Sequence, residues 1–253
     1  IDSVPIGTHM YIDTIELCSA FLNYQIVLPG TFCDFTSNVV GDFYEDLLTP
    51  DIPIIYSVGI DTATSLMVLK WNQNPQSDTY GYVIYTFDEN GILFELDTVW
   101  GLESTNYSYA ISFEDGPFTY SVAAFDSCET SSTPVTFQTS AKAPLHTSMV
   151  SESIVYMCEQ EAVITWTEYE GSQTDFYEIW SLSNGVWNLE EITEETSVTI
   201  PVNGNQSYTL FINSIFTDGH NAFSSPTSFI VPIAGSPNYN YLKLVTVIDG
   251  NIE

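Results

Sequence analysis

The sequence contains no arginine and only three lysines, Lys70, Lys142 and Lys243, among 253 residues. Against them stand 33 Asp and Glu residues, which give a formal net charge of -30. Binding to a phosphate backbone depends on Lys and Arg, so this shortage excludes nucleic acid and anionic membrane surfaces as partners. Hydrophobic residues make up 44% of the chain and aromatic residues 14%. The chain therefore has ample material for a packed core and is not a disordered acidic tail.

Long apolar runs are also missing. No stretch approaches the ~20 apolar residues that span a bilayer, and the N-terminus lacks a basic region followed by an apolar run. We therefore expect no membrane insertion. Both ends of the chain read as strands, "IDSV" at the start and "VTVIDGNIE" at the end. This predicts that the chain is a window from a longer polypeptide.

A helical pattern is absent as well, because no segment sustains apolar residues at i, i+3, i+4 and i+7. Instead, runs of roughly five to nine residues rich in Val, Ile, Thr, Tyr and Phe alternate in polarity, as half-buried antiparallel strands do. Turn pairs that tolerate positive φ separate the runs, among them Asn90-Gly91, Asn184-Gly185 and Asn203-Gly204. The predicted fold class is all-β, as tandem immunoglobulin-like β-sandwiches of about 90 to 100 residues with about seven strands each.

An internal repeat supports this division. Trp71 and Trp166 lie 95 residues apart, and each ends a short alternating run, "SLMVLKW" or "EAVITW". Fourteen residues after each Trp comes another aromatic residue, Tyr85 or Trp180. Because repeats of this length are supersecondary or domain units, the two tryptophans are expected to mark equivalent core positions of two modules.

A long alternating strand follows later in each unit, and a similar strand occurs near the start of the chain. "LNYQIVL" at Leu22 matches "FTYSVAA" at Phe118, and "IDSV" at Ile1 matches "LDTV" at Leu96. Three alternate positions of this strand in the first complete unit are Tyr120, Val122 and Ala124. Their counterparts in the second complete unit are Leu210, Ile212 and Ser214. The window is thus expected to hold two whole modules and two fragments.

The expected domains follow from this repeat. Residues 1–50 are the C-terminal half of a module plus a linker, 51–141 and 142–236 are complete modules, and 237–253 are the first strands of a further module. Linkers rich in Pro and small residues are expected at 47–53, 140–146 and 234–240. Since these are short, neighbouring modules should sit end to end with restricted bending.

Several segments together resemble a fibronectin type III module. These are the Trp that closes the second strand, the third strand and hairpin "GYVIYTFDENG", and "YSVAAFDSC" followed by a Pro-containing last strand. More narrowly, "DTVWGLESTNYSYAI" and "AAFDSCETSSTPVTFQTSAKAPLHTS" resemble the tandem modules of very large Bacteroidetes surface proteins. Those proteins are gliding-motility-associated, adhesin-like substrates of the type 9 secretion system. The resemblance covers nearly the whole chain.

The resemblance implies an extracellular, non-enzymatic structural or adhesive segment at the cell surface. Its expected partners are the neighbouring modules of the same chain, and surface polysaccharide or the secretion and gliding machinery. Two alternatives stay open. The modules could be spacers of a secreted polysaccharide-degrading enzyme, or a calcium-dependent carbohydrate-binding module.

Four cysteines are present, and none has the CxxC spacing of a zinc or redox site. We expect two disulfides, Cys18–Cys33 within one module and Cys128–Cys158 across the linker between two modules. The second would limit bending and stabilise the chain by ~2 to 4 kcal/mol. The alternative is four free thiols, as in cytosolic chains.

Catalytic motifs are absent from the sequence. His9, His146 and His220 are far apart, and there is no G-x-S-x-G, H-E-x-x-H or phosphate-binding glycine loop. Adjacent carboxylates are expected by chance in a chain this acidic. We therefore expect no enzyme activity and no catalytic cofactor.

Calcium is the one cofactor that the composition leaves open, because hard cations take oxygen ligands from Asp, Glu and carbonyls. The densest candidate is the hairpin around residue 90, with Asp88, Glu89, Asn90 and Glu95 as ligands. It is not a D-x-D-x-D-G loop, so a simple hairpin turn within a diffuse counterion atmosphere is the alternative.

Two further groups of residues could contact or carry sugar. Phe43, Tyr44, Trp100 and Trp187 could stack on sugar rings, although aromatic residues of sandwiches more often fill cores or contacts between modules. Asp-Ser/Thr-aliphatic triplets resemble the O-glycosylation motif of exported Bacteroidetes proteins, and they occur at Ser3, Thr14, Thr62 and Thr98. Ordinary threonines at strand ends are the alternative for this second group.

Overall fold

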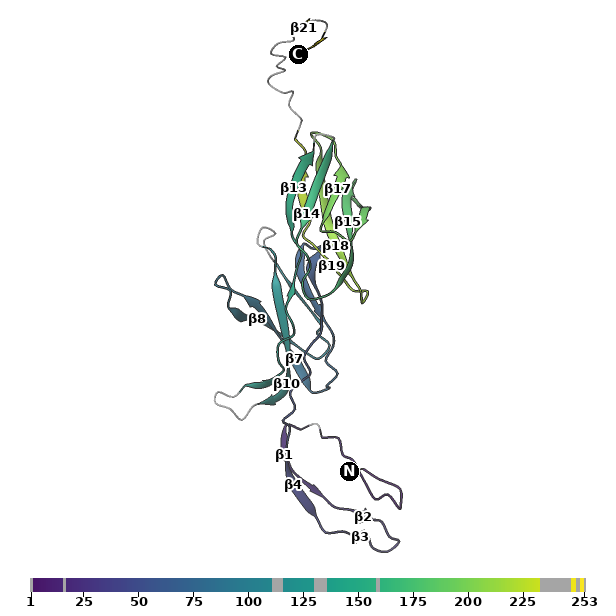
Figure 1. The fold of residues 1–253 in the computed structure, drawn as a ribbon. Coiled ribbons are helices and arrows are strands. Elements are labelled where there is room, and N and C mark those ends of the chain that lie inside the picture. Colours follow the sequence, from purple (N-terminus) through teal and green to yellow (C-terminus); the bar gives the residue numbers. More distant parts are fainter. Residues whose placement is uncertain are drawn as a thin grey trace.

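The structure is a computed structural model that describes residues 2–15, 17–110, 116–129, 136–157, 160–232, 247–248 and 251–252. These residues form strands and no helix, so the all-β prediction is confirmed. Within the same residues, therefore, no helix is long and apolar enough to cross a membrane. A β-hairpin and two β-sandwiches follow one another along a single long axis (Figure 1).

The first sandwich consists of two antiparallel sheets. One has the order β5-β6-β9 and the other β11-β10-β7-β8, with β12 also pairing with β10. This is the strand order of an immunoglobulin-like sandwich of the fibronectin type III kind. The strands are β5 (Ile55–Asp61), β6 (Leu66–Trp71), β7 (Thr79–Phe87), β8 (Leu93–Trp100), β9 (Asn106–Tyr109), β10 (Thr119–Glu129), β11 (Phe137–Thr139) and β12 (His146–Thr147).

The second sandwich repeats this arrangement. One sheet has the order β13-β14-β17 and the other β16-β15-β18-β19, with β20 also pairing with β18. The strands are β13 (Ser151–Met157), β14 (Glu161–Trp166), β15 (Thr174–Ser183), β16 (Val186–Thr193), β17 (Ser197–Pro201), β18 (Ser207–Phe216), β19 (Asn221–Phe223) and β20 (Thr227–Ile230).

The two tryptophans of the repeat occupy equivalent places in the two cores, as predicted. Trp71 is buried and packs edge to face on Tyr82, with 5.3 Å between ring centroids. Trp166 is buried in the same way against Tyr177, at 5.5 Å. The hydroxyl of Tyr82 accepts the amide proton of Asn74 at 3.0 Å. The apolar period of two in the sequence therefore places the large rings between the sheets.

The first hairpin spans Ser19–Glu45 and lies beyond one end of the first sandwich (Figure 1). Its two antiparallel ladders join β1 (Ser19–Tyr24) to β4 (Val40–Glu45) and β2 (Val27–Leu28) to β3 (Phe35–Thr36). At the other end of the chain, β21 (Val247–Ile248) pairs with β22 (Asn251–Ile252).

The two segments expected as linkers within the described residues are both held by hydrogen bonds. The segment before β5 is fixed where the side-chain amide of Asn74 donates to the carbonyl of Asp51 at 2.8 Å. The segment 140–146 runs along β10, and the amide of Ala143 donates to the carbonyl of Val122 at 2.8 Å. β12, which lies after the expected boundary at residue 141, then pairs with β10. The Pro- and Ala-containing stretch is therefore part of an irregular edge strand.

Candidate functional site: the two junctions between modules

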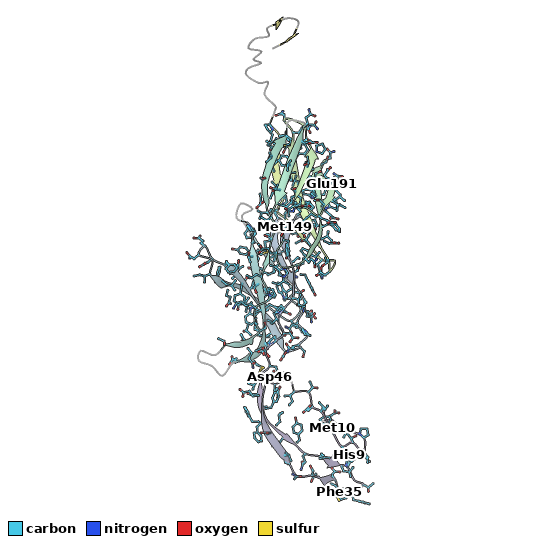
Figure 2. The ribbon with its side chains drawn as sticks, in the orientation of Figure 1. His9, Met10, Phe35, Asp46, Met149 and Glu191 are labelled. Atoms are coloured by element: carbon cyan, nitrogen blue, oxygen red, sulfur yellow. A yellow bond between two sulfur atoms is a disulfide. The ribbon has the colours of Figure 1, made fainter. Side chains whose placement is uncertain are left out.

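The junction between the first hairpin and the first sandwich is closed by a disulfide. Cys18, directly before β1, bonds to Cys128 near the end of β10, with a Cα–Cα distance of 5.0 Å and a sequence separation of 110. The amide of Asp46 donates to the Cys18 carbonyl at 2.8 Å, and the Gln138 side-chain amide donates to the Asp46 carbonyl at 2.7 Å. Figure 2 shows Asp46 between the hairpin and the first sandwich. Covalent and backbone contacts thus fix this junction.

Both predicted cysteine pairings are wrong. Cys18 does not pair with Cys33, and Cys128 does not pair with Cys158, because Cys18 and Cys128 pair with each other. Cys33 is exposed and forms no disulfide with another cysteine that the structure describes. It lies in the turn between β2 and β3, at the opposite end of the hairpin from Cys18, where Figure 2 places nearby Phe35. Cys158 lies outside the described residues.

A buried carboxyl group lies beside the disulfide. Asp126 is fully buried, and its Oδ1 accepts the amide proton of Cys128 at 2.8 Å, while its Oδ2 has no hydrogen-bond partner among the residues that the structure describes. Burial, and to a lesser extent the charges of Asp78 and Asp46, raise the pKa of Asp126 to about 6. The hydrogen bond from the backbone amide of Cys128 lowers the pKa of Asp126 and so partly offsets this increase. At neutral pH this junction therefore carries an ionised buried carboxylate among others of like charge.

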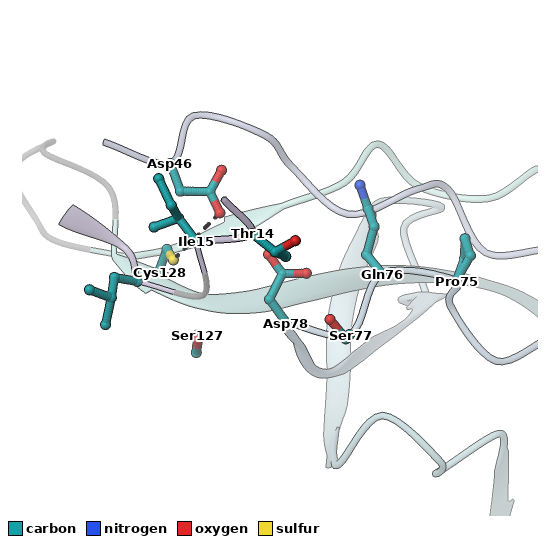
Figure 3. A pocket seen from close by; sticks show the side chains of 10 residues that line it. Thr14, Ile15, Asp46, Pro75, Gln76, Ser77, Asp78, Ser127 and Cys128 are labelled. Atoms are coloured by element: carbon teal, nitrogen blue, oxygen red, sulfur yellow. Dashed lines mark hydrogen bonds between the residues drawn. The ribbon is translucent and has the colours of Figure 1, made fainter. Parts of the chain in front are cut away.

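A hollow of about 270 Å³ lies beside the disulfide and is lined in part by Cys128, and Figure 3 shows Asp46 and Asp78 around it. Asp46 Oδ2 lies 4.0 Å from Cys128 Sγ, and Thr14, Gln76 and both carboxylates line the hollow. Among the described residues, no three or more His, Cys, Asp and Glu side chains come together so that they could hold a metal ion.

The junction between the two sandwiches is built around the hydroxyl group of Tyr169. This group accepts the amide proton of Val58 on β5 at 2.9 Å. It also lies 2.9 Å from Nδ1 of His146, which belongs to the first sandwich. Since the hydroxyl proton is not used toward Val58, it is free to be donated to Nδ1 of a neutral imidazole. One buried side chain of the second sandwich therefore satisfies two polar groups of the first.

Two glycines allow the close packing of this junction. At Gly59 on β5, a Cβ atom would lie 2.8 Å from both the amide nitrogen and the carbonyl oxygen of Phe223 on β19. At Gly171, with φ of +111°, a Cβ atom would collide with the ring of His146. Thr147 and Glu170 form a bridge of two backbone hydrogen bonds beside them, at 2.9 and 3.2 Å. β5 is consequently buried on both faces, and the apolar cores of the two sandwiches form one contiguous cluster.

The imidazole of His146 is buried at this junction, and burial lowers its pKa to about 4. The neutral form fits the contact with Tyr169, because a protonated ring could not accept a hydrogen bond at Nδ1. Of the other two histidines, His220 stacks on Tyr56 at a centroid distance of 4.2 Å, again across this junction, while His9 is exposed near the N-terminus.

The predicted calcium ligands lie in the hairpin between β7 and β8. Oδ1 of Asp88 accepts the amide protons of Asn90 at 2.9 Å and Ile92 at 2.8 Å, and these bonds lower the pKa of Asp88. Glu95 Oε1 instead accepts the hydroxyl proton of Thr98 at 3.2 Å, and Glu89 is exposed. The Asp88 carboxylate thus stabilises the turn with Gly91 at φ of +74°. Calcium binding here stays a prediction.

The four aromatic residues considered for sugar contacts fall in different surroundings. Trp100 lies in a cluster on β7, β8, β10 and β11, with centroids 5.3 Å from Tyr80 and from Phe125. Trp187 packs on Phe211 at 4.6 Å. Phe43 is exposed on β4, and its neighbour Tyr44 is half-buried. Sugar binding by these residues stays a prediction.

The four glycosylation candidates are all within the described residues. Ser3 and Thr14 are exposed in the segment before the first hairpin, Thr62 lies in the turn after β5, and Thr98 lies on β8. Their modification also stays a prediction.

Sequence reasoning did not single out Gly59, Tyr169 or Asp126. Only the glycine carried a readable signal, because an isolated Gly inside a strand pattern indicates a bulge or a close approach of another backbone. Asp126 continues the alternation of core positions along its strand, but a charged residue there does not by itself indicate burial. Tyr169 lies outside the alternating runs, and the role of both residues depends on a neighbour distant in sequence.

Disulfide mapping tests the hairpin junction. Digestion without reduction should release a linked peptide pair that contains Cys18 and Cys128, and iodoacetamide should modify Cys33 in the native, unreduced protein. Cys18→Ser should lower the free energy of unfolding by about 2–4 kcal/mol, whereas Cys33→Ser should change it little. A peptide that links Cys18 to Cys33 would contradict this arrangement.

Two substitutions should change the pH dependence of stability in opposite directions. The pKa of His146 is about 4 in the folded protein and about 6.5 in the unfolded chain. Its contribution to the free energy of unfolding is therefore complete above pH 6.5 and is lost as the pH falls toward 4. The pKa of Asp126 is about 6 when folded against 3.8 unfolded, so its contribution is present at low pH and is lost as pH rises toward 6. Relative to wild type, His146→Asn should gain stability on acidification and Asp126→Asn on alkalinisation, measured by urea unfolding. If the free energy of unfolding changed with pH in the same way in wild type and both variants, the altered pKa values of His146 and Asp126 would be contradicted.

Comparisons with known proteins give similarities in solved structures only. No protein-family profile matches the chain, and no curated protein matches it in sequence. The sixth fibronectin type III domain of human fibronectin type III domain containing protein 3 is 14% identical, with a TM-score of 0.31, over 34% of this chain and 86% of that one. The FN1–FN3 domains of chicken CNTN1 are 13% identical, with a TM-score of 0.33, over 79% and 72%. A two-domain fibronectin type III segment of chicken tenascin is 16% identical, with a TM-score of 0.27, over 73% and 99%.

Proposed function

We propose that the chain is a structural spacer segment of a long extracellular surface protein, exported by the type 9 secretion system and used in gliding or attachment. The observation that carries the structural part is the junction between the two sandwiches. There β5 has its outer face buried by the second sandwich, so that the two sandwiches share one apolar cluster. A spacer that holds a terminal adhesive domain away from a cell needs this kind of stiff joint.

The secretion and attachment part of the proposal is supported by sequence features. The resemblance of the modules to adhesin-like Bacteroidetes surface proteins supports it, and so does a disulfide, which persists mainly in oxidising compartments. Surface polysaccharide or the gliding machinery would be the partners of the complete protein. No catalytic role for these residues forms part of the proposal.

Small-angle X-ray scattering tests the stiffness of the joint. The wild-type profile should fit one elongated conformer. Gly59→Trp should instead require an ensemble of bent conformers, because an indole cannot fit where a Cβ would already lie 2.8 Å from the Phe223 backbone. Ala63→Trp is the matched control, since Ala63 is exposed in the next turn and the profile should not change. A wild-type profile that itself requires bent conformers would refute the stiff spacer.

Immunolabelling of the source cells tests the location. Antibodies raised against this chain should label intact cells, and protease added outside should remove the label. Deletion of the secretion machinery should abolish surface labelling while the protein accumulates inside. Label that appears only after permeabilisation of wild-type cells would refute export, and it would leave the scattering result unaffected.

A further inference from the structure

We propose that the first hairpin is an acceptor surface whose occupant is a complementary half-sandwich of the same polypeptide, built like β5, β6 and β7. The hairpin would supply the last two strands of a module, and the occupant would supply the first three. This inference rests on the proposed function only in taking the chain as an array of tandem modules.

The first observation is a set of positions that are buried in the core of the sandwiches but exposed to solvent in the hairpin. In the internal repeat, Tyr24, Ile26 and Leu28 stand where the first sandwich has Tyr120, Val122 and Ala124. The exposed fractions are 44%, 75% and 50% in the hairpin, against 3%, 0% and 0% in the sandwich. The counterparts in the second sandwich, Leu210, Ile212 and Ser214, are also buried. Exposed apolar side chains at positions that are core in both sister modules indicate a missing partner sheet.

The second observation is an unpaired strand edge. β10 lies between β7 and β11, and β18 lies between β15 and β19. The stretch that matches β10 in the repeat contains the end of β1 and all of β2, and it pairs with β4 and β3 alone among the strands that the structure describes. Its other edge presents free backbone amide and carbonyl groups, which are a template for one more strand. The equivalent of β7, with apolar residues at the places of Tyr82 and Ile84, is the strand that this edge fits.

The third observation concerns the segment before the hairpin. By the repeat, Ile1–Val4 match Leu96–Val99, so residues 9–14 match the region of β9. In the first sandwich β9 pairs with β6, whereas the described residues of 2–15 form no strand and expose Ile6, Met10 and Ile12. Two separate stretches thus each lack a neighbour, and the two missing neighbours, β6 and β7, are consecutive strands of one half-module. This identifies the occupant as a half-sandwich and not as a small apolar ligand.

The experiment extends the chain with its own first-half strands. A second copy of residues 51–95 is placed before Ile1, which keeps the repeat spacing because Ile1 matches Leu96. Amide hydrogen exchange is followed by mass spectrometry in peptides that cover residues 19–28, in the original and the extended chain. Exchange there should slow by about tenfold or more in the extended chain. Binding of the dye ANS to the exposed face should fall with it.

Matched controls separate packing from simple lengthening. The extended chain with Ile26→Asp should keep the fast exchange of the original, because a charge would enter the completed core. Unchanged exchange in the extended chain without this substitution would overturn the proposal. Slow exchange already present in the original chain, together with concentration-dependent dimers in sedimentation, would also overturn it, because a second copy would then cover the face. Neither result changes the scattering test, which concerns the two complete sandwiches.

Discussion

The backbone contact between Gly59 and Phe223 is the constraint on which the shape of the two-sandwich unit depends. Because no side chain separates β5 from β19 at this point, the two strands approach until the cores of both modules merge. The close approach then brings the Val58 amide within reach of the Tyr169 hydroxyl. A larger residue at position 59 would move these polar groups apart, leaving a buried amide without a partner. Packing and polar satisfaction at the junction therefore depend on the same missing side chain.

The charge of the chain explains why its junctions contain neutral contacts. With three lysines against 33 acidic residues, few carboxylates can find an opposite charge, and modules brought end to end repel each other. The sandwich junction uses aromatic rings, glycines and neutral hydrogen bonds, and the hairpin junction uses a disulfide. Among the described residues, Lys142 forms no ion pair with a carboxylate. Its Nζ instead lies 4.4 Å from the centroid of the Tyr85 ring. Association in this chain is thus achieved without pairing charges.

The sequence was sufficient for the parts that depend on local periodicity. Alternating runs and the spacing of Trp71 and Trp166 predicted two sandwiches with equivalent cores, because a strand that buries one face must alternate in polarity. The disulfide could not be predicted by the same means. Cys18 and Cys128 are brought together by the stacking of one module on the next, and nothing in a local pattern records that stacking. The same holds for Tyr169 and Asp126, whose burial comes from distant neighbours. The segment 140–146 was expected to be a linker but runs along β10 as an irregular edge strand. Its Pro and Ala are compatible with either arrangement, so the sequence could not distinguish them.

The disulfide also determines how tension would pass through the chain. If the two ends are pulled, force enters along the segment before Cys18, crosses the sulfur–sulfur bond and continues from Cys128. Everything between them, which includes the whole hairpin, strands β5 to β9 and nearly all of β10, forms a closed loop that carries no load along its backbone. That loop, with its sequence separation of 110, could otherwise lengthen the protein by roughly 370 Å if it unravelled. A single covalent bond thus acts as a stop that limits how far the protein can stretch.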